Sequence, residues 1–184
     1  EVYDGRRFVF LEHRMSDRRE LHTATRLHDG RVLICGGFHG GVCSVASADL
    51  YIPARRAFVA TGELGRSRYG HTATLLDDGR VLTAGGMEFP GEATLAGTEI
   101  YDPKAGVFEI APSMREERSR HTATRLPGGR VLITGGYSAE RGCQLASTEL
   151  FDPSGMSFSP GPEMSAPRMD HSATPLPDGR VLIA

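Results

Sequence analysis

One short motif recurs four times in this chain and restricts its fold more than any other feature. A His-Thr/Ser-Ala-Thr run begins at His22, His71, His121 and His171, at spacings of 49, 50 and 50 residues. An arginine stands three residues before each histidine, at Arg19, Arg68, Arg118 and Arg168. A period of about 50 residues is longer than that of the common helical repeats. The chain therefore uses one structural unit several times.

The first half of each unit carries the signals of a β-hairpin. The His-Thr-Ala-Thr run alternates its side chains between two faces, as a strand does, and an Arg-Val-Leu run follows it. Between the two runs a glycine supplies the positive φ that a tight hairpin turn needs, at Gly30, Gly79, Gly129 and Gly179. A Gly-Gly pair closes the second run at residues 36–37, 85–86 and 135–136.

The second half of each unit is marked by an acid and two aromatic residues. The acid stands two residues before the first aromatic, in the pairs Asp49/Tyr51, Glu99/Tyr101, Glu149/Phe151 and Glu1/Tyr3. The second aromatic follows seven residues later, at Phe58, Phe108, Phe158 and Phe10. Asp-Pro pairs at residues 102–103 and 152–153 start turns between them. We expect four short antiparallel strands in each unit.

Composition excludes several classes of function. The chain is 39% hydrophobic and 24% charged with a net charge of −2, which is ordinary for a folded globular protein. It contains no block of like charges for nucleic acid and no apolar run long enough for a membrane helix. Cys35, Cys43 and Cys143 are expected to be free thiols, with a Cys35–Cys43 disulfide as the alternative, and the cellular compartment stays open.

The ordered set of features resembles the kelch family over nearly the whole chain. The Gly-Gly pair after an apolar strand, the aromatic pair and the arginine that opens the next unit carry this resemblance, and Asp-Gly-Arg-Val before Gly-Gly is similar to the propellers of galactose-oxidase-type proteins and bacterial kelch relatives. The resemblance implies an all-β, kelch-type β-propeller of about four blades, each with four antiparallel strands. Kelch repeats usually carry a tryptophan, and this chain has none, so the second aromatics stand in its place.

The expected domain is a partial propeller that spans residues 1–184. It has three complete repeat units at approximately 19–67, 68–117 and 118–167, and half blades at 1–18 and 168–184. Kelch rings usually resemble six- or seven-bladed closures, which need roughly 300–350 residues at this period. The sequence, which begins Glu1-Val2-Tyr3-Asp4 without an initiator methionine or signal peptide, is therefore expected to be part of a longer propeller. A four-bladed ring closed by the two half blades is the alternative.

Repeated polar residues are interpreted as scaffold. The four histidines of the motif suggest a metal site, but each occupies the same place in its own unit, so they should diverge around the ring and form contacts between blades. The repeated arginines and acids are expected to form ion pairs and hydrogen bonds that hold strands and blades together. We therefore predict no metal site, no cofactor and no catalytic residue.

Positions that differ between units are the candidates for binding, because a repeat scaffold varies the residues that meet a ligand. Two sets differ: the pair between the repeated arginine and histidine, and the loop after Gly-Gly. The resemblance implies that both sets lie on one face of the ring; the alternative is that they are unconstrained surface. The candidate binding residues are Glu20, Leu21, Phe38, His39, Tyr69, Met87, Phe89, Ser119, Arg120, Tyr137, Met169 and Asp170.

Two functions are compatible with these observations. The first is a non-catalytic binding module that recognises a protein or carbohydrate partner through aromatic residues and arginine, the residue types common at interface hot spots. The second is the structural part of a galactose-oxidase-like copper enzyme whose catalytic residues lie outside this chain. The resemblance would imply copper held by tyrosines and histidines, with one tyrosine crosslinked to cysteine, and no such set is recognisable here. Hydrolase, zinc-protease and phosphate-loop motifs do not occur either.

Overall fold

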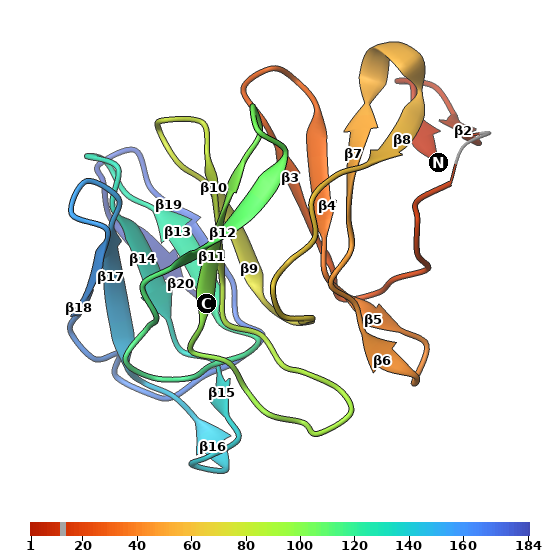
Figure 1. Cartoon of the computed structure of the whole chain (residues 1–184). Helices are drawn as coiled ribbons and strands as arrows, with labels where there is room; N and C mark the ends of the chain where they lie inside the picture. Colours follow the sequence, from red (N-terminus) through yellow and green to blue (C-terminus); the bar gives the residue numbers. More distant parts are fainter. Residues whose placement is uncertain (12–13) are drawn as a thin grey trace.

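The structure is a computed structural model that describes residues 1–11 and 14–184. Most of its regular structure belongs to three four-stranded antiparallel sheets, here called sheets I, II and III (Figure 1). Sheet I contains β3 (Thr23–Arg26), β4 (Val32–Cys35), β7 (Ala48–Ile52) and β8 (Ala57–Ala60). Sheet II contains β9 (Thr72–Leu75), β10 (Val81–Ala84), β11 (Thr98–Asp102) and β12 (Val107–Ala111). Sheet III contains β13 (Thr122–Arg125), β14 (Val131–Thr134), β17 (Thr148–Asp152) and β18 (Ser157–Pro160).

The remaining elements are short. The N-terminal hairpin is β1 (Val2–Tyr3) with β2 (Phe8–Val9), and the C-terminal hairpin is β19 (Ala173–Pro175) with β20 (Val181–Ile183). Two further hairpins project from sheets I and III: β5 (Phe38–His39) with β6 (Cys43–Ser44), and β15 (Tyr137–Ser138) with β16 (Cys143–Gln144). A 3-10 turn, Pro53–Arg55, connects β7 to β8.

Strand register is the same in all three sheets. The valine of the Arg-Val-Leu run lies opposite the first aromatic of its unit, as in the pairs Val32–Tyr51, Val81–Tyr101 and Val131–Phe151. The glycine at the end of each first turn has positive φ, 86° at Gly30 and 89° at Gly79, as the sequence predicted. The prediction of four antiparallel strands per complete unit is confirmed.

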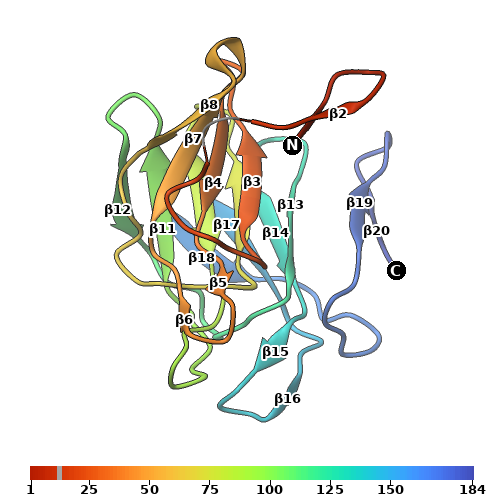
Figure 2. The same ribbon diagram turned by 90° about the vertical axis from the view of Figure 1, so that its right-hand side faces the viewer.

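The sheets stack face to face in sequence order. Their first strands, β3, β9 and β13, lie next to one another and are followed by β19 (Figures 1 and 2). One apolar cluster joins Leu33 and Leu50 of sheet I to Tyr101 of sheet II, and a second joins Leu82 of sheet II to Phe151 of sheet III. Both aromatic rings are fully buried. Because side chains alternate between the two faces of a strand, one face of sheet II packs against sheet I and the other face packs against sheet III.

This arrangement is all-β and compatible with consecutive blades of a β-propeller. No sheet closes on itself, and in the described residues each terminal hairpin pairs only within itself. Figure 1 places the N-terminal hairpin beside sheet I, and β19 of the C-terminal hairpin packs against β13 of sheet III, so the two half blades do not close a four-bladed ring in the described residues. In the described part of the chain, no helix is long and apolar enough to cross a membrane.

One aromatic prediction was wrong. Phe10 was expected to be the second aromatic of its unit, but Phe8 takes that place: it lies opposite Tyr3, as Phe58 lies opposite Tyr51, with 5.4 Å between the ring centroids of Tyr3 and Phe8. The connection between these two strands is two residues shorter than in the other units, so the ring that reaches Tyr3 comes earlier in the sequence. Phe10 itself is 81% exposed. The three cysteines are free thiols, as expected.

Candidate functional site

The repeated histidines connect neighbouring sheets. His71 Nε2 lies 3.1 Å from the hydroxyl of Thr23 in sheet I, and His121 Nε2 lies 3.0 Å from that of Thr72 in sheet II. His171 Nε2 contacts the hydroxyl of Thr122 in sheet III at the same distance. Each histidine therefore contacts the threonine that follows the histidine of the preceding unit. This geometry confirms the prediction of contacts between units.

Burial keeps these imidazoles neutral. Desolvation, reinforced by the positive charge of the repeated arginine, lowers the pKa of His71 and of His121 to about 3. Their Nδ1 atoms are buried without a hydrogen-bond partner in the described residues. In the part of the chain that the structure describes, no group of three or more His, Cys, Asp or Glu side chains could hold a metal ion.

The repeated arginine binds the acid of its own unit in the interior. Arg68 Nη2 donates to Glu99 Oε1 at 2.6 Å, with the two side chains 1% and 5% exposed. Arg68 Nη1 donates to the carbonyl oxygens of Gly85 and Gly97 at 3.0 and 2.9 Å. The second oxygen of Glu99 accepts the backbone N–H of Gly65, in the segment that enters the unit. Arg19–Asp49 and Arg118–Glu149 repeat the pairing.

The first glycine of each Gly-Gly pair makes room for the next unit. A Cβ atom on Gly85 would lie 2.4 Å from the carbonyl oxygen of Arg118 and 2.8 Å from Cε1 of His121. Gly85 also has φ of +62°, which L side chains rarely adopt. The second glycine, Gly86, donates its N–H to the same carbonyl oxygen at 2.9 Å. The doublet is therefore part of the contact between sheets.

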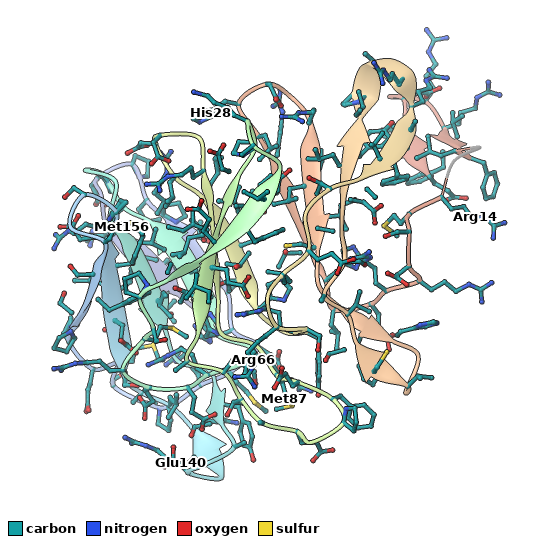
Figure 3. The ribbon with its side chains drawn as sticks, viewed as in Figure 1. Arg14, His28, Arg66, Met87, Glu140 and Met156 are labelled. Carbon is teal, nitrogen blue, oxygen red and sulfur yellow. The ribbon has the colours of Figure 1, made fainter. Side chains whose placement is uncertain are left out.

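The two variable sets predicted as binding residues are brought together by backbone pairing. Glu20 exchanges two hydrogen bonds with Phe38, at 2.9 and 2.7 Å, and Tyr69 exchanges two with Met87, at 3.0 and 2.9 Å. Ser119 and Tyr137 pair in the same way. These pairs lie where β5–β6 and β15–β16 project, the end of the molecule that carries Met87 and Glu140 in Figure 3.

Three rings form an aromatic cluster at this end. Phe38 lies between Tyr69 and Phe89, with ring centroids 5.0 and 5.4 Å apart, and the Phe89 contact is edge-to-face. The Tyr69 hydroxyl donates to Sδ of Met87 at 2.9 Å. All four side chains are half-buried, so each presents part of its surface to solvent. The repeat units that form sheets I and II thus contribute jointly to one apolar surface.

A second part of this end is a mouth lined by the residues that precede the repeated histidines. Leu21, Gly70, Arg120 and Asp170 all have φ between 53° and 61°. Their backbones form a chain: Gly70 N–H donates to Leu21, Arg120 to Gly70, and Asp170 to Arg120. The side chains of Arg120 and Asp170 form an exposed ion pair at 3.3 Å. Together with the histidines they line a hollow of about 420 Å³.

Two further hollows are lined by other predicted residues. Met87, Arg120, Tyr137 and Met169 line one of about 220 Å³. Glu20, Phe38 and His39 line another with Arg18, Gly40 and Val42. Ser119 is the exception among the predicted residues, because its side chain is buried and only its backbone takes part.

A pocket at the opposite end was not predicted. It has a volume of about 330 Å³. It lies where the β3–β4 turn of sheet I and the β9–β10 turn of sheet II meet the β11–β12 turn at Asp102 and Pro103, near His28 at the top of Figure 3. Arg31 crosses it and donates to the carbonyl oxygen of Pro103 at 2.9 Å. The sequence signal for this pocket is the repeated Asp-Gly-Arg turn, which by itself predicts only a hairpin.

The fold and this end of the molecule define a class: an all-β repeat protein in which stacked four-stranded sheets carry varied loops. No protein-family model matches the sequence, and no curated protein is similar enough to be recognised as a relative.

Proposed function

We propose that this chain is a kelch-type repeat scaffold without catalytic activity, which binds a protein or carbohydrate partner at the end where its varied residues gather. This end is here called the variable face. It comprises the aromatic cluster of Phe38, Tyr69 and Phe89 and the mouth around Arg120 and Asp170.

The observation that carries the proposal is the contrast between repeated and varied positions. The repeated arginines, acids and glycines contact one another in the interior, and His71 and His121 are buried beside threonines of the preceding sheets. The varied positions pair across two loop sets and leave side chains of unrelated chemistry at one end. A scaffold with a constant interior and a varied end is the usual design of repeat proteins that bind partners.

The chemistry of the variable face favours a protein segment or a glycan. Half-exposed aromatic rings supply apolar area at a small cost in side-chain entropy, and they stack on sugar or aromatic ring faces. Arg120, with 45% of its side chain exposed, can exchange its Asp170 partner for a ligand carboxylate, because a surface ion pair is worth only about 0–1 kcal/mol.

Binding of the whole chain to an array of defined glycans and to a library of tiled peptides tests the proposal. A Tyr69→Ala variant should weaken any bound probe at least about tenfold, since it removes a central ring of the cluster. Lys104→Ala, an exposed change at the opposite end, should leave binding unchanged.

Failure would be recognisable. Binding that survives Tyr69→Ala and Arg120→Ala together, in a variant with the wild-type melting temperature, would exclude the variable face. Loss of binding in Lys104→Ala alone would move the site to the other end.

A further inference from the structure

The pocket at the end opposite the variable face lies between sheets I and II, each of which has all four of its strands in this chain. The β3–β4, β9–β10 and β11–β12 turns surround it, near His28 in Figure 3. Its volume of about 330 Å³ is at the lower end of the roughly 300–1,000 Å³ that is typical of pockets for small molecules. Four side chains with basic nitrogens line it: His28, Arg31, Arg80 and Lys104.

The corresponding place between sheets II and III is bridged by an ion pair. There Asp77 of the β9–β10 turn points toward the β13–β14 turn, so that a Cβ atom on Gly129 would lie 2.7 Å from its Oδ2. The same carboxylate forms an ion pair with Arg125 of β13. His28 lies against sheet II in the same way, since a Cβ atom on Gly79 would lie 3.4 Å from its Nδ1.

Sheet II does not offer His28 the partner that sheet III offers Asp77. Leu75 lies opposite Val81, as Arg125 lies opposite the corresponding valine of sheet III, so an apolar side chain stands where the bridging arginine would be. The imidazole of His28 forms no hydrogen bond with any described residue. The space between the turns of sheets I and II is therefore left open, with a polar group at its edge.

The aspartates that line this pocket are already bound within their own turns. Asp29 accepts the backbone N–H and the Nε–H of Arg31 at 3.0 and 2.7 Å. Asp78 accepts the same two groups of Arg80 at 3.0 and 2.8 Å. Asp102 accepts two backbone N–H groups of the β11–β12 turn at 2.8 and 3.4 Å. Each carboxylate therefore has hydrogen-bond donors without a ligand.

Hydrogen-bond donors, in contrast, are left over. Nη2 of Arg31 donates to the carbonyl oxygen of Pro103 at 2.9 Å, but Nη1 has no partner among the described residues, and the same holds for Nη1 of Arg80. Lys104 is the only lysine of the chain, and its ammonium group forms no ion pair with any described residue. In sheet III its place is taken by Ser154, whose hydroxyl donates to the carboxylate of its own turn at 2.7 Å.

From these unused donors we propose that the pocket binds a small organic anion through a carboxylate or phosphate group. Both groups accept several charge-assisted hydrogen bonds from arginine and lysine side chains, here Arg31, Arg80 and Lys104. The two arginine side chains are only 29% and 35% exposed, and partial shielding from water strengthens such bonds. A neutral imidazole at His28 adds one N–H donor, and Pro103 supplies an apolar wall for a compact carbon skeleton.

Isothermal titration calorimetry of the whole chain with succinate and with glycerol 2-phosphate tests the proposal and distinguishes the two anionic groups. We expect one of them to bind at a single site with a Kd of about 1 mM or lower, and the other to bind more weakly. Glycerol, which lacks the anionic group, should not bind. If neither anion gave a saturable signal at concentrations about tenfold above that Kd, the proposal would be refuted.

Substitutions locate the bound anion. Lys104→Ala removes an unpaired cation and His28→Asp adds a negative charge, both at exposed side chains, so each variant should keep the wild-type melting temperature and weaken binding at least about tenfold. Arg130→Ala is the matched control, because Arg130 occupies the place of Arg80 in the β13–β14 turn, is exposed and does not line the pocket. An equal loss in this control, or wild-type affinity in the first two variants, would overturn the assignment.

This site is independent of the function proposed for the variable face, and the variants separate the two. Tyr69→Ala should bind the anion as the wild type does, whereas Lys104→Ala should lose the anion and keep any partner of the variable face. Acetylation adds a second readout, because Lys104 carries the only side-chain amine. A saturating anion should slow acetylation of Lys104, measured by mass spectrometry, at least about tenfold while the α-amino group reacts as before. Protection of both amines, or of neither, would contradict binding in this pocket.

Discussion

Removal of the Arg68 side chain probes the energetics of the interior most directly. Arg68 binds Glu99 at 2.6 Å and two backbone carbonyl oxygens near 3 Å, all in a region that solvent hardly reaches. In Arg68→Ala, Glu99 keeps only the N–H of Gly65 and becomes a buried charge without a counter-ion. Breaking a buried pair in this way costs about 3–5 kcal/mol.

For a domain of this size that loss corresponds to a melting temperature lower by about 6–20 °C. Calorimetry with urea unfolding measures both quantities. Arg80→Ala is the control, since Arg80 forms an ion pair with Asp78 at a similar distance, 2.7 Å, but with the two side chains 35% and 46% exposed. It should cost only about 0–1 kcal/mol.

The double variant Arg68→Ala/Glu99→Gln completes the test. It removes the unpaired charge while Gln retains an oxygen for the N–H of Gly65, so it should recover part of the stability that Arg68→Ala loses. If Arg68→Ala melted as late as Arg80→Ala, the interior ion pairs would not stabilise this fold, and the interpretation of the repeated arginines would be wrong.

Three further predictions concern other repeated or buried groups. Gly85→Ala should lower the free energy of unfolding by about 2–4 kcal/mol in urea titrations, whereas Gly97→Ala, with open space around its Cβ, should cost much less. The pKa of His121 is about 3 in the folded state, below the ordinary 6.5, so between these pH values the unfolded state binds one proton more than the folded state. The free energy of unfolding should therefore fall by about 1.4 kcal/mol per pH unit as the pH drops from 6.5 toward 3. His121→Gln should make the free energy of unfolding measurably less dependent on pH in this range. Burial raises the pKa of Cys35 to about 11, so a thiol reagent at mildly alkaline pH should modify exposed Cys143 at least about a hundredfold faster, and equal rates would mean that the fold opens.

Local pattern predicted much of this fold because each unit repeats both its strands and its turns. The glycine turns, the hairpins and the structural use of the histidines all followed from residues at fixed spacing. The prediction for Phe10 was wrong because the turn between β1 and β2 is shorter than in the other units and shifts which residue lies opposite Tyr3. Strand register depends on turn geometry, which the spacing of residues alone does not determine. The left-handed backbone conformation of Leu21, Arg120 and Asp170 could not be predicted from the sequence either, since nothing in those side chains requires it.

The site was harder to predict than the scaffold. That the two variable sets lie together came from family resemblance, and the structure places them so by backbone pairing. Their role in binding stays a prediction. The sequence alone could not reveal that the Ser119 side chain is buried while that of Arg120 is 45% exposed, because Arg120 adopts a left-handed backbone conformation that nothing in its side chain requires.

The contacts of the interior also explain why we propose that binding involves the varied positions and not the repeated ones. Each repeated group makes contacts on which the packing of the sheets depends. Gly85 leaves space for His121 of the next unit, and His121 contacts Thr72 of the preceding sheet. Arg68 binds both Glu99 and two backbone carbonyl groups. A substitution at any of them would disturb two sheets at once, so these positions cannot change to suit a ligand. Tyr69 and Met87 share only a backbone pairing and one side-chain contact at the edge of the sheets. They can therefore vary between units without destabilising the stacked sheets, and this is the physical reason for proposing the variable face as the binding surface.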